Sequence, residues 1–383
     1  MTPMRDTAEV VVIGGGVVGC AVAYNLAKLG LTDVVVVEKG YLACGATGRC
    51  GGGIRQQWST LPNTRMAMAS VRLFEGLEEE LGYPTEYTQG GYLILAYTED
   101  EVAQYRQNVA MQRGLGLDVR FLTPAQAHDV VPCLNTAGVL AATHCPTDGK
   151  GNPFLITRGY ALAAERLGAE VNLHTTVTDI EVAGGKVQAV VTDKGRIATR
   201  WVVNAAGGHA AAIGVLVGLD VPVKPYRHEI LVTEPIEPLF DPLIISFYHG
   251  TYIVQEPHGS ILMGQGNPDE PSSYNLRSGL PFARSITRKM VWLIPCLKDV
   301  KVVRQWAGLY AMTPDAQPIL GPVDDLEGYV QAVGFSGHGF MVAPITGQLV
   351  AEFIVRGETS LPIDGLSMGR FAGELVHREA SVV

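Results

Sequence analysis

A glycine-rich loop near the N-terminus constrains the fold of this chain more than any other feature. The apolar run Val10–Ile13 leads directly into residues 14–19, whose sequence GGGVVG has the spacing G-x-G-x-x-G, and a helical pattern follows over Cys20–Gly30. A short apolar run before such a loop is typical of a buried parallel strand. The sequence therefore predicts the strand, loop and helix of a Rossmann-type dinucleotide-binding unit.

The residues of this loop have separate tasks. Gly14 permits a tight turn, Gly16 lets the backbone approach a pyrophosphate, and Gly19 lets the helix pack closely on the strand. Val17 and Val18 lie where a helix N-terminus offers free N–H groups and a partial positive charge to phosphates. We predict that these five residues form the cofactor site, the alternative being a glycine-rich turn without a ligand.

An acidic residue follows at the distance that such a unit requires. A second apolar run, Val34–Val37, predicts the next strand, and Glu38 ends it 19 residues after Gly19. A carboxylate there accepts hydrogen bonds from a ribose diol and repels a 2′-phosphate, so NADP is disfavoured. The loop and Glu38 together do not distinguish FAD from NAD.

Size and charge narrow the class of protein. A chain of 383 residues is large for one core, so two domains are expected, and a net charge of −9 without a basic run argues against binding to nucleic acid.

The longest apolar tract, residues 202–219, contains polar residues and glycines, so it predicts a buried segment and no transmembrane segment is expected. The six cysteines form no C-x-x-C pair and the histidines form no spaced ligand set, so neither a disulfide framework nor a metal site is predicted. The first residues lack the pattern of a secretory signal, and we expect a cytoplasmic protein.

Four later segments resemble the D-amino-acid-oxidase-like family of FAD-dependent oxidoreductases, and the likeness extends over nearly the whole chain. The segments are Cys44–Gln57, Val202–Gly208, Arg304–Gly321 and Gly334–Met341. Within that family, the strings GGIRQQ, PTDGK and GFSGHGFM are most similar to the beta subunits of heteromeric sarcosine oxidases and dye-linked L-proline dehydrogenases. The resemblance implies FAD as the cofactor.

The resemblance also implies a fold of the α/β class with discontinuous domains. A Rossmann-type, glutathione-reductase-like FAD-binding domain would comprise residues 1–84, 145–223 and 304–383. It would be interleaved with a smaller α+β substrate-binding domain, built on an antiparallel sheet, at residues 85–144 and 224–303. The inserted parts agree with this organisation, because they contain predicted strands at Gly90–Leu95, Thr251–Gln255 and Ser260–Met263 and an amphipathic helix at Glu99–Arg113. A helix over Pro344–Phe353 is predicted to direct its N-terminus at the flavin ring.

Further cofactor contacts are carried over from the family residue by residue. The residues implied are Lys39, Thr47, Gly48, Arg49, Gly52, Gly53, Ile54, Val177, Ala205, Ala206, Gly207, Gly308, Gly334, Gly337, His338, Gly339, Phe340 and Met341. For Arg49 a surface salt bridge is the alternative. No histidine occurs at Gly151-Asn152-Pro153, where the resemblance aligns a covalent FMN attachment, so FAD should be noncovalent and an FMN at an interface with a partner subunit stays open as a noncovalent second flavin.

Five residues are candidates for catalysis and substrate binding. Arg55 is predicted to bind a substrate carboxylate through two parallel hydrogen bonds, the alternative being a pair with a backbone carbonyl or a structural acid. His228 and Tyr252 lie on segments that line the pocket in relatives, with ordinary packing as the alternative. Tyr310 stands where glycine oxidases carry an arginine, so only a phenol hydrogen bond is expected there. His338 is predicted to lie against the flavin, or else to fill a turn.

The predicted function is that of a flavin dehydrogenase for a secondary-amine amino acid, with L-proline oxidised to 1-pyrroline-5-carboxylate as the best single candidate. Sarcosine, hydroxyproline or opines are alternatives, as is a non-catalytic electron-relay subunit. Two lysines of monomeric sarcosine oxidases are replaced here by Leu262 and Met341, and the first replacement favours a dehydrogenase over an oxidase, because a cation stabilises superoxide. The resemblance implies partner subunits that carry electrons onward, through which the protein would be peripheral to a membrane.

Overall fold

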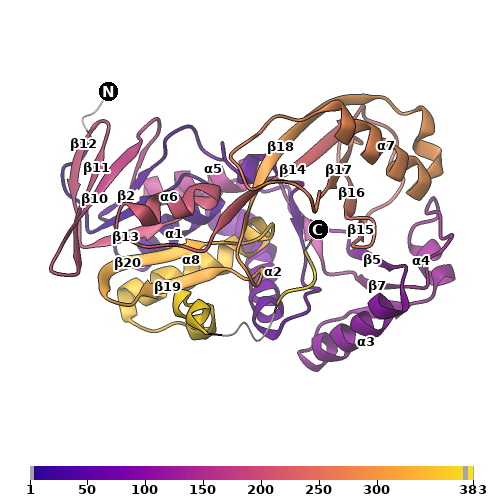
Figure 1. The fold of residues 1–383 in the computed structure, drawn as a ribbon, viewed down its shortest axis with the longest axis horizontal. Coiled ribbons are helices and arrows are strands. Elements are labelled where there is room, and N and C mark those ends of the chain that lie inside the picture. The colour runs from indigo at the N-terminus through magenta and orange to yellow at the C-terminus, as the bar shows by residue number, and fades with distance from the viewer. Residues whose placement is uncertain (1–3, 374–377, 383) are drawn as a thin grey trace.

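Two large sheets and one small sheet organise the chain in the computed structural model, which describes residues 4–373 and 378–382 (Figure 1). The first large sheet has the order β10-β11-β20-β13-β1-β2-β9, with β12 paired to β11 and β19 to β20. Its strands are β1 (Val10–Ile13), β2 (Val34–Val37), β9 (Glu170–Asn172), β10 (Val177–Ala183), β11 (Lys186–Thr192), β12 (Gly195–Ala198), β13 (Trp201–Asn204), β19 (Ile319–Val323) and β20 (Leu326–Val333). The central strands β20, β13, β1, β2 and β9 are parallel.

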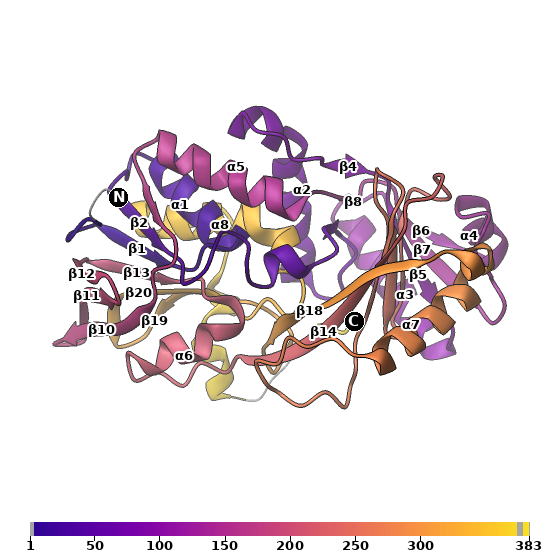
Figure 2. The same cartoon turned by 90° about the horizontal axis from the view of Figure 1, so that it is seen from above.

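Helices cover one face of this sheet. Figure 2 shows α1 (Val17–Lys28), α5 (Pro153–Arg166) and α8 (Gly339–Arg356) side by side along it, and α2 (Leu61–Leu81) packs on α8. The contact is close because Gly347 of α8 lies against the backbone of Ala21 in α1. The predicted strands Val10–Ile13 and Val34–Val37 are confirmed, and their all-valine and isoleucine composition fits strands that are buried along their length.

The second large sheet has the order β18-β14-β17-β16-β15-β5-β7-β6 and is antiparallel except where β15 pairs with β5. Its strands are β5 (Tyr92–Ala96), β6 (Arg120–Leu122), β7 (Ala141–Cys145), β14 (Lys224–Thr233), β15 (Leu243–Ser246), β16 (Thr251–Gln255), β17 (Ile261–Gln265) and β18 (Val302–Met312). The helices α3 (Glu99–Gly114), α4 (Pro124–Val130) and α7 (Leu280–Leu293) flank it, and α3 begins with a capping box between Thr98 and Glu101. The predicted strand Thr251–Gln255 and helix Glu99–Arg113 are therefore present, whereas the strands predicted at Gly90–Leu95 and Ser260–Met263 begin later.

The remaining elements are short. A small sheet joins β3 (Gly53–Ile54), β8 (Gly149–Lys150) and β4 (Thr88–Gln89). The short helix α6 (Ala210–Val215) follows β13, and 3₁₀ turns occupy Thr47–Arg49, Gly207–His209, Pro295–Asp299, Asp364–Leu366 and Met368–Ala372. The α/β class is thus confirmed. The division of the chain at residues 84, 144, 223 and 303 stays a prediction; β18 crosses the last of these positions and pairs with β14 in the second sheet.

The ladder of β14 and β18 links the two large sheets. It runs from the pair Lys224–Met312 to the pair Thr233–Val302. At its first end, the backbone N–H of Ser336 donates a 2.9 Å hydrogen bond to the carbonyl oxygen of Ala311, just after β20 of the first sheet. The long strands therefore extend from one sheet to the other.

The structure corrects the predicted start of the last long helix. Helix α8 begins at Gly339, five residues before the predicted start at Pro344, which lies inside the helix. Proline is tolerated best in the first turn of a helix, and this preference misplaced the start. Helix α8 is also the one described helix long and apolar enough to cross a membrane by length and composition, but 67% of it is buried inside the protein, as expected of a core helix. The apolar tract at 202–219 instead forms β13 and α6.

Candidate functional site

A cavity of about 540 Å³ extends from the glycine loop to the inner face of the second sheet. Most of the predicted site residues line it: Gly14, Gly16, Val17, Val18, Glu38, Lys39, Thr47, Arg49, Gly52, Gly53, Arg55, Val177, Ala205, Ala206, Gly207, His228, Tyr252, Gly308, Tyr310, Gly337, Gly339, Phe340 and Met341. These residues are distributed along the whole sequence, and the fold brings them into one wall.

The glycine loop is held by contacts that leave no room for side chains. Gly14 has a φ of +121°, and a side chain there would place its first carbon 2.4 Å from the carbonyl oxygen of Ala205. At Gly19 the same carbon would lie 2.0 Å from the carbonyl oxygen of Gly14. Gly16 is the N-cap of α1 and provides no side-chain cap, so the helix end is open toward the cavity. This arrangement fits an anionic group such as a pyrophosphate.

Glu38 braces the loop from the next strand. One of its carboxylate oxygens accepts a 2.7 Å hydrogen bond from the N–H of Gly15, and the other accepts a 2.7 Å bond from the N–H of Gly40. The hydroxyl oxygen of Thr47 accepts a 3.2 Å bond from the N–H of Val17 at the helix start. A carboxylate and a hydroxyl therefore fix the backbone on which a dinucleotide would rest.

Five of the predicted residues do not line the cavity: Gly19, Gly48, Ile54, Gly334 and His338. The three glycines are required by close packing, since a side chain at Gly48 or Gly334 would lie about 2.5 Å from Ala43 or Thr313. Ile54 is fully buried in the core around α1 and α8. These residues shape the site from behind its wall.

Arg49 connects the loop of residues 44–50 to β18. Its guanidinium donates to the carbonyl oxygen of Ala307 at 3.0 Å and to that of Cys44 at 3.2 Å. The indole N–H of Trp306 donates in return to the carbonyl oxygen of Arg49 at 3.1 Å. Arg49 takes part in none of the ion pairs found in the described part of the chain, so the surface salt bridge is not formed.

Arg55 is a buried cation that faces the cavity. Its side chain is 4% exposed, its guanidinium stacks 3.8 Å from the ring centre of Trp58, and it donates to the carbonyl oxygens of Gln57 at 3.0 Å and Ser381 at 2.6 Å. None of the ion pairs among residues 4–373 and 378–382 includes it. Burial lowers the pKa of Arg55 from its usual value, although a guanidinium keeps its proton. The carboxylates of Glu379 and Asp148 act on the charge of Arg55 from beyond ion-pair distance, so this positive charge has no direct carboxylate partner among the described residues.

His228 lies between two tyrosine rings on the second sheet. Its ring is parallel to those of Tyr310, at 4.3 Å between centres, and Tyr252, at 5.7 Å. Burial lowers the pKa of His228 to about 4, so the imidazole is neutral at pH 7, and its Nε2 has no hydrogen-bond partner among the described residues. Burial also raises the pKa of both tyrosines, which therefore stay protonated. Gly337 makes room for Tyr310, because a side chain there would lie 2.5 Å from its ring.

His338 lies behind the cavity wall. It is 1% exposed, its ring centre is 4.6 Å from that of Trp58, and neither ring nitrogen has a hydrogen-bond partner within the described chain. Burial lowers the pKa of His338 to about 4. Its position is that of a packed, neutral imidazole at the N-cap of α8.

The two positions compared with lysines of relatives differ in the structure. Met341 lines the cavity, whereas Leu262 does not and packs instead against the cluster around Tyr92 and Ile245. The cationic residues of the wall are Lys39, Arg49 and Arg55. Leu262 therefore gives no direct information about how the cavity treats oxygen.

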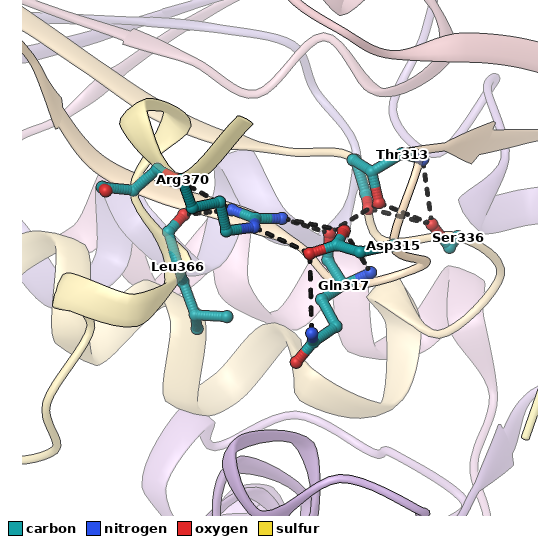
Figure 3. A network of polar contacts seen from close by, with 8 residues as sticks. Thr313, Asp315, Gln317, Ser336, Leu366 and Arg370 are labelled. Atoms are coloured by element: carbon teal, nitrogen blue, oxygen red, sulfur yellow. Dashed lines mark hydrogen bonds and ion pairs between the residues drawn. The ribbon is translucent and has the colours of Figure 1, made fainter. Parts of the chain in front are cut away.

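Sequence reasoning missed several wall residues, among them Trp58, Tyr92, Ser336, Ser381 and Val382. A local signal existed for Ser336, because it lies within the string GFSGHGFM, and Thr313, 23 residues earlier in the sequence, supports it. Figure 3 shows Thr313 and Ser336 joined, with the backbone N–H of Thr313 donating to the Ser336 hydroxyl oxygen at 3.2 Å. Asp315 pairs with Arg370 at 2.8 Å, which ties the chain after α8 to the same turn.

Metal binding finds no support in the part of the chain that the structure describes, where no three or more His, Cys, Asp or Glu side chains gather in a way that could hold an ion. The site is thus organised around an anion seat at a helix end, a buried arginine and neutral aromatic side chains.

Comparisons with known proteins agree with this arrangement. Residues 9–353 match the family model DAO, described as FAD dependent oxidoreductase. The chain is 31% identical to sarcosine oxidase subunit beta of Rhodobacter capsulatus, over 92% of this chain and 86% of that protein. It is 28% identical to mitochondrial dimethylglycine dehydrogenase of Homo sapiens, over 97% of this chain but 45% of that protein.

Solved structures show the same likeness. The crystal structure of L-proline dehydrogenase from P. horikoshii is 39% identical with a TM-score of 0.92, over 96% of this chain and 99% of that one. Glycine oxidase from Geobacillus kaustophilus is 28% identical with a TM-score of 0.88, over 96% of this chain and 99% of that chain.

Proposed function

The chain belongs to the DAO family of FAD-dependent oxidoreductases and binds FAD, and from that premise we propose that it is a dehydrogenase for a secondary-amine amino acid, with L-proline as the best single substrate. The coarser function, that of a family of amino acid oxidases and dehydrogenases, is shared by its relatives. The choice of L-proline is supported by the 39% identity to an L-proline dehydrogenase structure.

The observation that carries the proposal is the charge state of Arg55. A buried cation without a carboxylate partner is costly unless a ligand supplies the opposite charge. Two of the five N–H groups of Arg55 are bonded to backbone carbonyls, which leaves others to bind a substrate carboxylate. An amino acid would bring that carboxylate into the cavity.

The neutral aromatic residues would act on the amine. An ammonium has no lone pair, so it must lose its proton before a hydride equivalent can leave the neighbouring carbon. The pKa of about 4 means that His228 does not keep this proton, which leaves to solvent, but its unpartnered, neutral Nε2 can accept a hydrogen bond from the amine. The rings of Tyr252 and Tyr310 offer apolar faces to a pyrrolidine ring. The chemistry that bound FAD would supply is acceptance of this hydride equivalent at N5, and oxidation of proline at the ring carbon beside nitrogen would give the cyclic imine 1-pyrroline-5-carboxylate.

Sarcosine is the second candidate, because the chain is 31% identical to a sarcosine oxidase subunit beta. Hydroxyproline, opines and a non-catalytic relay role remain outcomes of a substrate screen. That relative's description as a subunit also supports partner chains that carry electrons onward. We further propose that FAD is bound noncovalently and that a noncovalent FMN can lie at an interface with a partner subunit. We also propose a cytoplasmic location. The FAD-binding and substrate-binding domains are proposed to divide the chain as the sequence predicts.

The test of this function is Arg55→Ala in the flavin-loaded protein. The affinity for proline should fall about 10- to 150-fold, because a charge-assisted hydrogen bond is worth roughly 1.5–3 kcal/mol. Flavin content should be unchanged, and Arg55→Lys should recover part of the affinity. Arg65→Ala, which changes an exposed arginine on α2, is the control.

Steady-state dye reduction with proline, sarcosine, both hydroxyproline series and opines is the measurement. The same assays with oxygen in place of dye should be slower if the chain is a dehydrogenase. Unchanged kinetics in Arg55→Ala with every substrate would assign Arg55 to packing and remove the central support for the proposal.

A further inference from the structure

The chain returns to the cavity at its C-terminal end. Ser381 and Val382 line the cavity, although Arg55, which they neighbour there, lies more than three hundred residues earlier in the sequence. Between α8 and this segment, Arg370 is fixed by its ion pair with Asp315 (Figure 3). Asp315 also accepts a 2.9 Å backbone hydrogen bond from the N–H of Glu379. The same turn therefore holds the chain at two places on its way to the cavity.

Glu379 attaches the segment to the start of α2. It is 2% exposed, and its carboxylate accepts bonds from the backbone N–H groups of Ser59 at 3.0 Å and Thr60 at 3.1 Å. It also accepts from the hydroxyls of Ser59 and Thr60, the latter at 2.7 Å, and from the side-chain amide of Asn63 at 3.0 Å. Burial opposes ionisation, but these donors outweigh it and keep the pKa of Glu379 below its ordinary value. The carboxylate is thus a fully bonded anchor.

The anchor positions the next residues. The N–H of Ala380 donates to the Ser59 hydroxyl oxygen at 3.0 Å, and the N–H of Ser381 donates to the Glu379 carboxylate at 3.0 Å. The carbonyl oxygen of Ser381 is then directed at Arg55 and accepts its 2.6 Å hydrogen bond. Packing alone does not require this polar contact. Arg55 is the one buried arginine of the described cavity wall that makes no ion pair, and the segment bonds to it directly.

We propose that Ser381 and Val382 form a fixed wall of the substrate site, and that Glu379 is a positioning residue which holds Ser381 against the guanidinium of Arg55. The wall closes the cavity beside Arg55 and limits the directions in which the guanidinium can point. The inference rests on the proposed function, in which Arg55 binds the substrate carboxylate. The ligands that fit this inference are small carboxylates, bound in a cavity where Val382 is the apolar wall residue next to Ser381.

The test is Glu379→Ala in the full-length, flavin-loaded protein, read out without turnover. Pyrrole-2-carboxylate, a planar carboxylate that resembles proline, is titrated while the flavin absorbance is followed. Its dissociation constant should rise at least about tenfold, because Arg55 loses its fixed position. Quenching of flavin fluorescence by acrylamide, a neutral probe, should increase because the wall is released. Ser59→Ala, which removes one support of the anchor, should shift both values in the same direction by less.

The control is Arg378→Ala, in the same segment but with an exposed side chain, which should leave both values unchanged. If Glu379→Ala leaves both carboxylate binding and quenching unchanged, the inference is overturned. The same holds if the variant only lowers the melting temperature and changes neither value. Should Glu379→Ala not fold, the same two values in Ser59→Ala decide the matter. If Arg55→Ala binds the carboxylate normally while Glu379→Ala still raises quenching, the proposed function fails and the wall stands.

Discussion

The two ends of the cavity are lined by different kinds of groups. At the glycine end, the surface is backbone: Gly14 and Gly16 provide the turn and the open helix end, and Glu38 is bonded to N–H groups. At the other end, the surface is side chains, with Arg55 and His228 brought from distant segments. A backbone seat is shaped by residues close in sequence, whereas a side-chain seat exists only once the chain has folded.

The ends also differ in how charge is satisfied. Neither Glu38 nor Arg55 makes an ion pair among the described residues. Both carboxylate oxygens of Glu38 accept backbone hydrogen bonds, whereas Arg55 has two of its five N–H groups bonded to backbone carbonyls. The carboxylate at the glycine end is therefore bonded at both oxygens within the protein, whereas the guanidinium at the other end keeps N–H groups that the proposed function assigns to a substrate. Substitutions should consequently affect stability and flavin retention at the first end, and substrate affinity at the second.

The largest effect is expected for Gly19→Ala. The added carbon would lie 2.0 Å from the carbonyl oxygen of Gly14, so α1 must move away from β1. We expect a loss of at least about 3 kcal/mol of unfolding free energy and a protein without flavin. Gly76→Ala in α2, where nothing lies within 4 Å, should instead stabilise by about 1 kcal/mol. Thermal unfolding and flavin content measure both, and equal behaviour of the two variants would remove the steric argument.

A somewhat smaller effect on the free energy of unfolding is expected when the pH is lowered, because His228 must then take up a proton. Its folded-state pKa of about 4 lies below the ordinary 6.5, so the unfolded chain binds more protons between these values. Stability is then complete above pH 6.5 and is lost as the pH falls toward 4, by at most about 3 kcal/mol. His228→Phe keeps a ring between the tyrosines and should flatten this dependence in urea unfolding. His338 has the same direction of shift, so part of the dependence should remain.

The smallest effect is expected for Thr47→Val. The variant is similar in shape but cannot accept the hydrogen bond from Val17, so it should cost about 1 kcal/mol. This loss should appear as weaker FAD binding in a titration of the apoprotein, with substrate affinity unchanged. Thr47→Ser keeps the hydroxyl and should behave as wild type. If Thr47→Val changed the affinity for proline but not the affinity for FAD, the glycine end would not be the part of the cavity that controls flavin binding.

Sequence patterns predicted the glycine end closely. The strands Val10–Ile13 and Val34–Val37 and the position of Glu38 follow from local periodicity and spacing, because each contact joins neighbouring elements. The other end depended on the family resemblance for Arg55 and His228. Trp58 and Ser381 carried no local signal, since their place in the wall results from tertiary packing alone.

Two glycines of the family motif lie behind the cavity wall. Gly48 and Gly334 pack closely against Ala43 and Thr313 and do not line the cavity, and their predicted role in binding the cofactor stays a prediction. The start of α8 was misplaced because Pro344 was treated as a helix start. A glycine in the sequence indicates that a side chain would clash at that position. It does not indicate whether the clash would be with a ligand in the cavity or with protein packed behind the cavity wall.

The long ladder of β14 and β18 restricts how ligands can enter and leave. It continues from Thr233–Val302 to Lys224–Met312, where Ala311 is bonded to Ser336 beside the first sheet. Bending within this ladder would break paired backbone hydrogen bonds, which are costly to leave unmade in a buried region. We therefore expect ligand exchange to depend on loops that border the cavity, and we expect the rate of product release to follow those loops more than bending of the ladder.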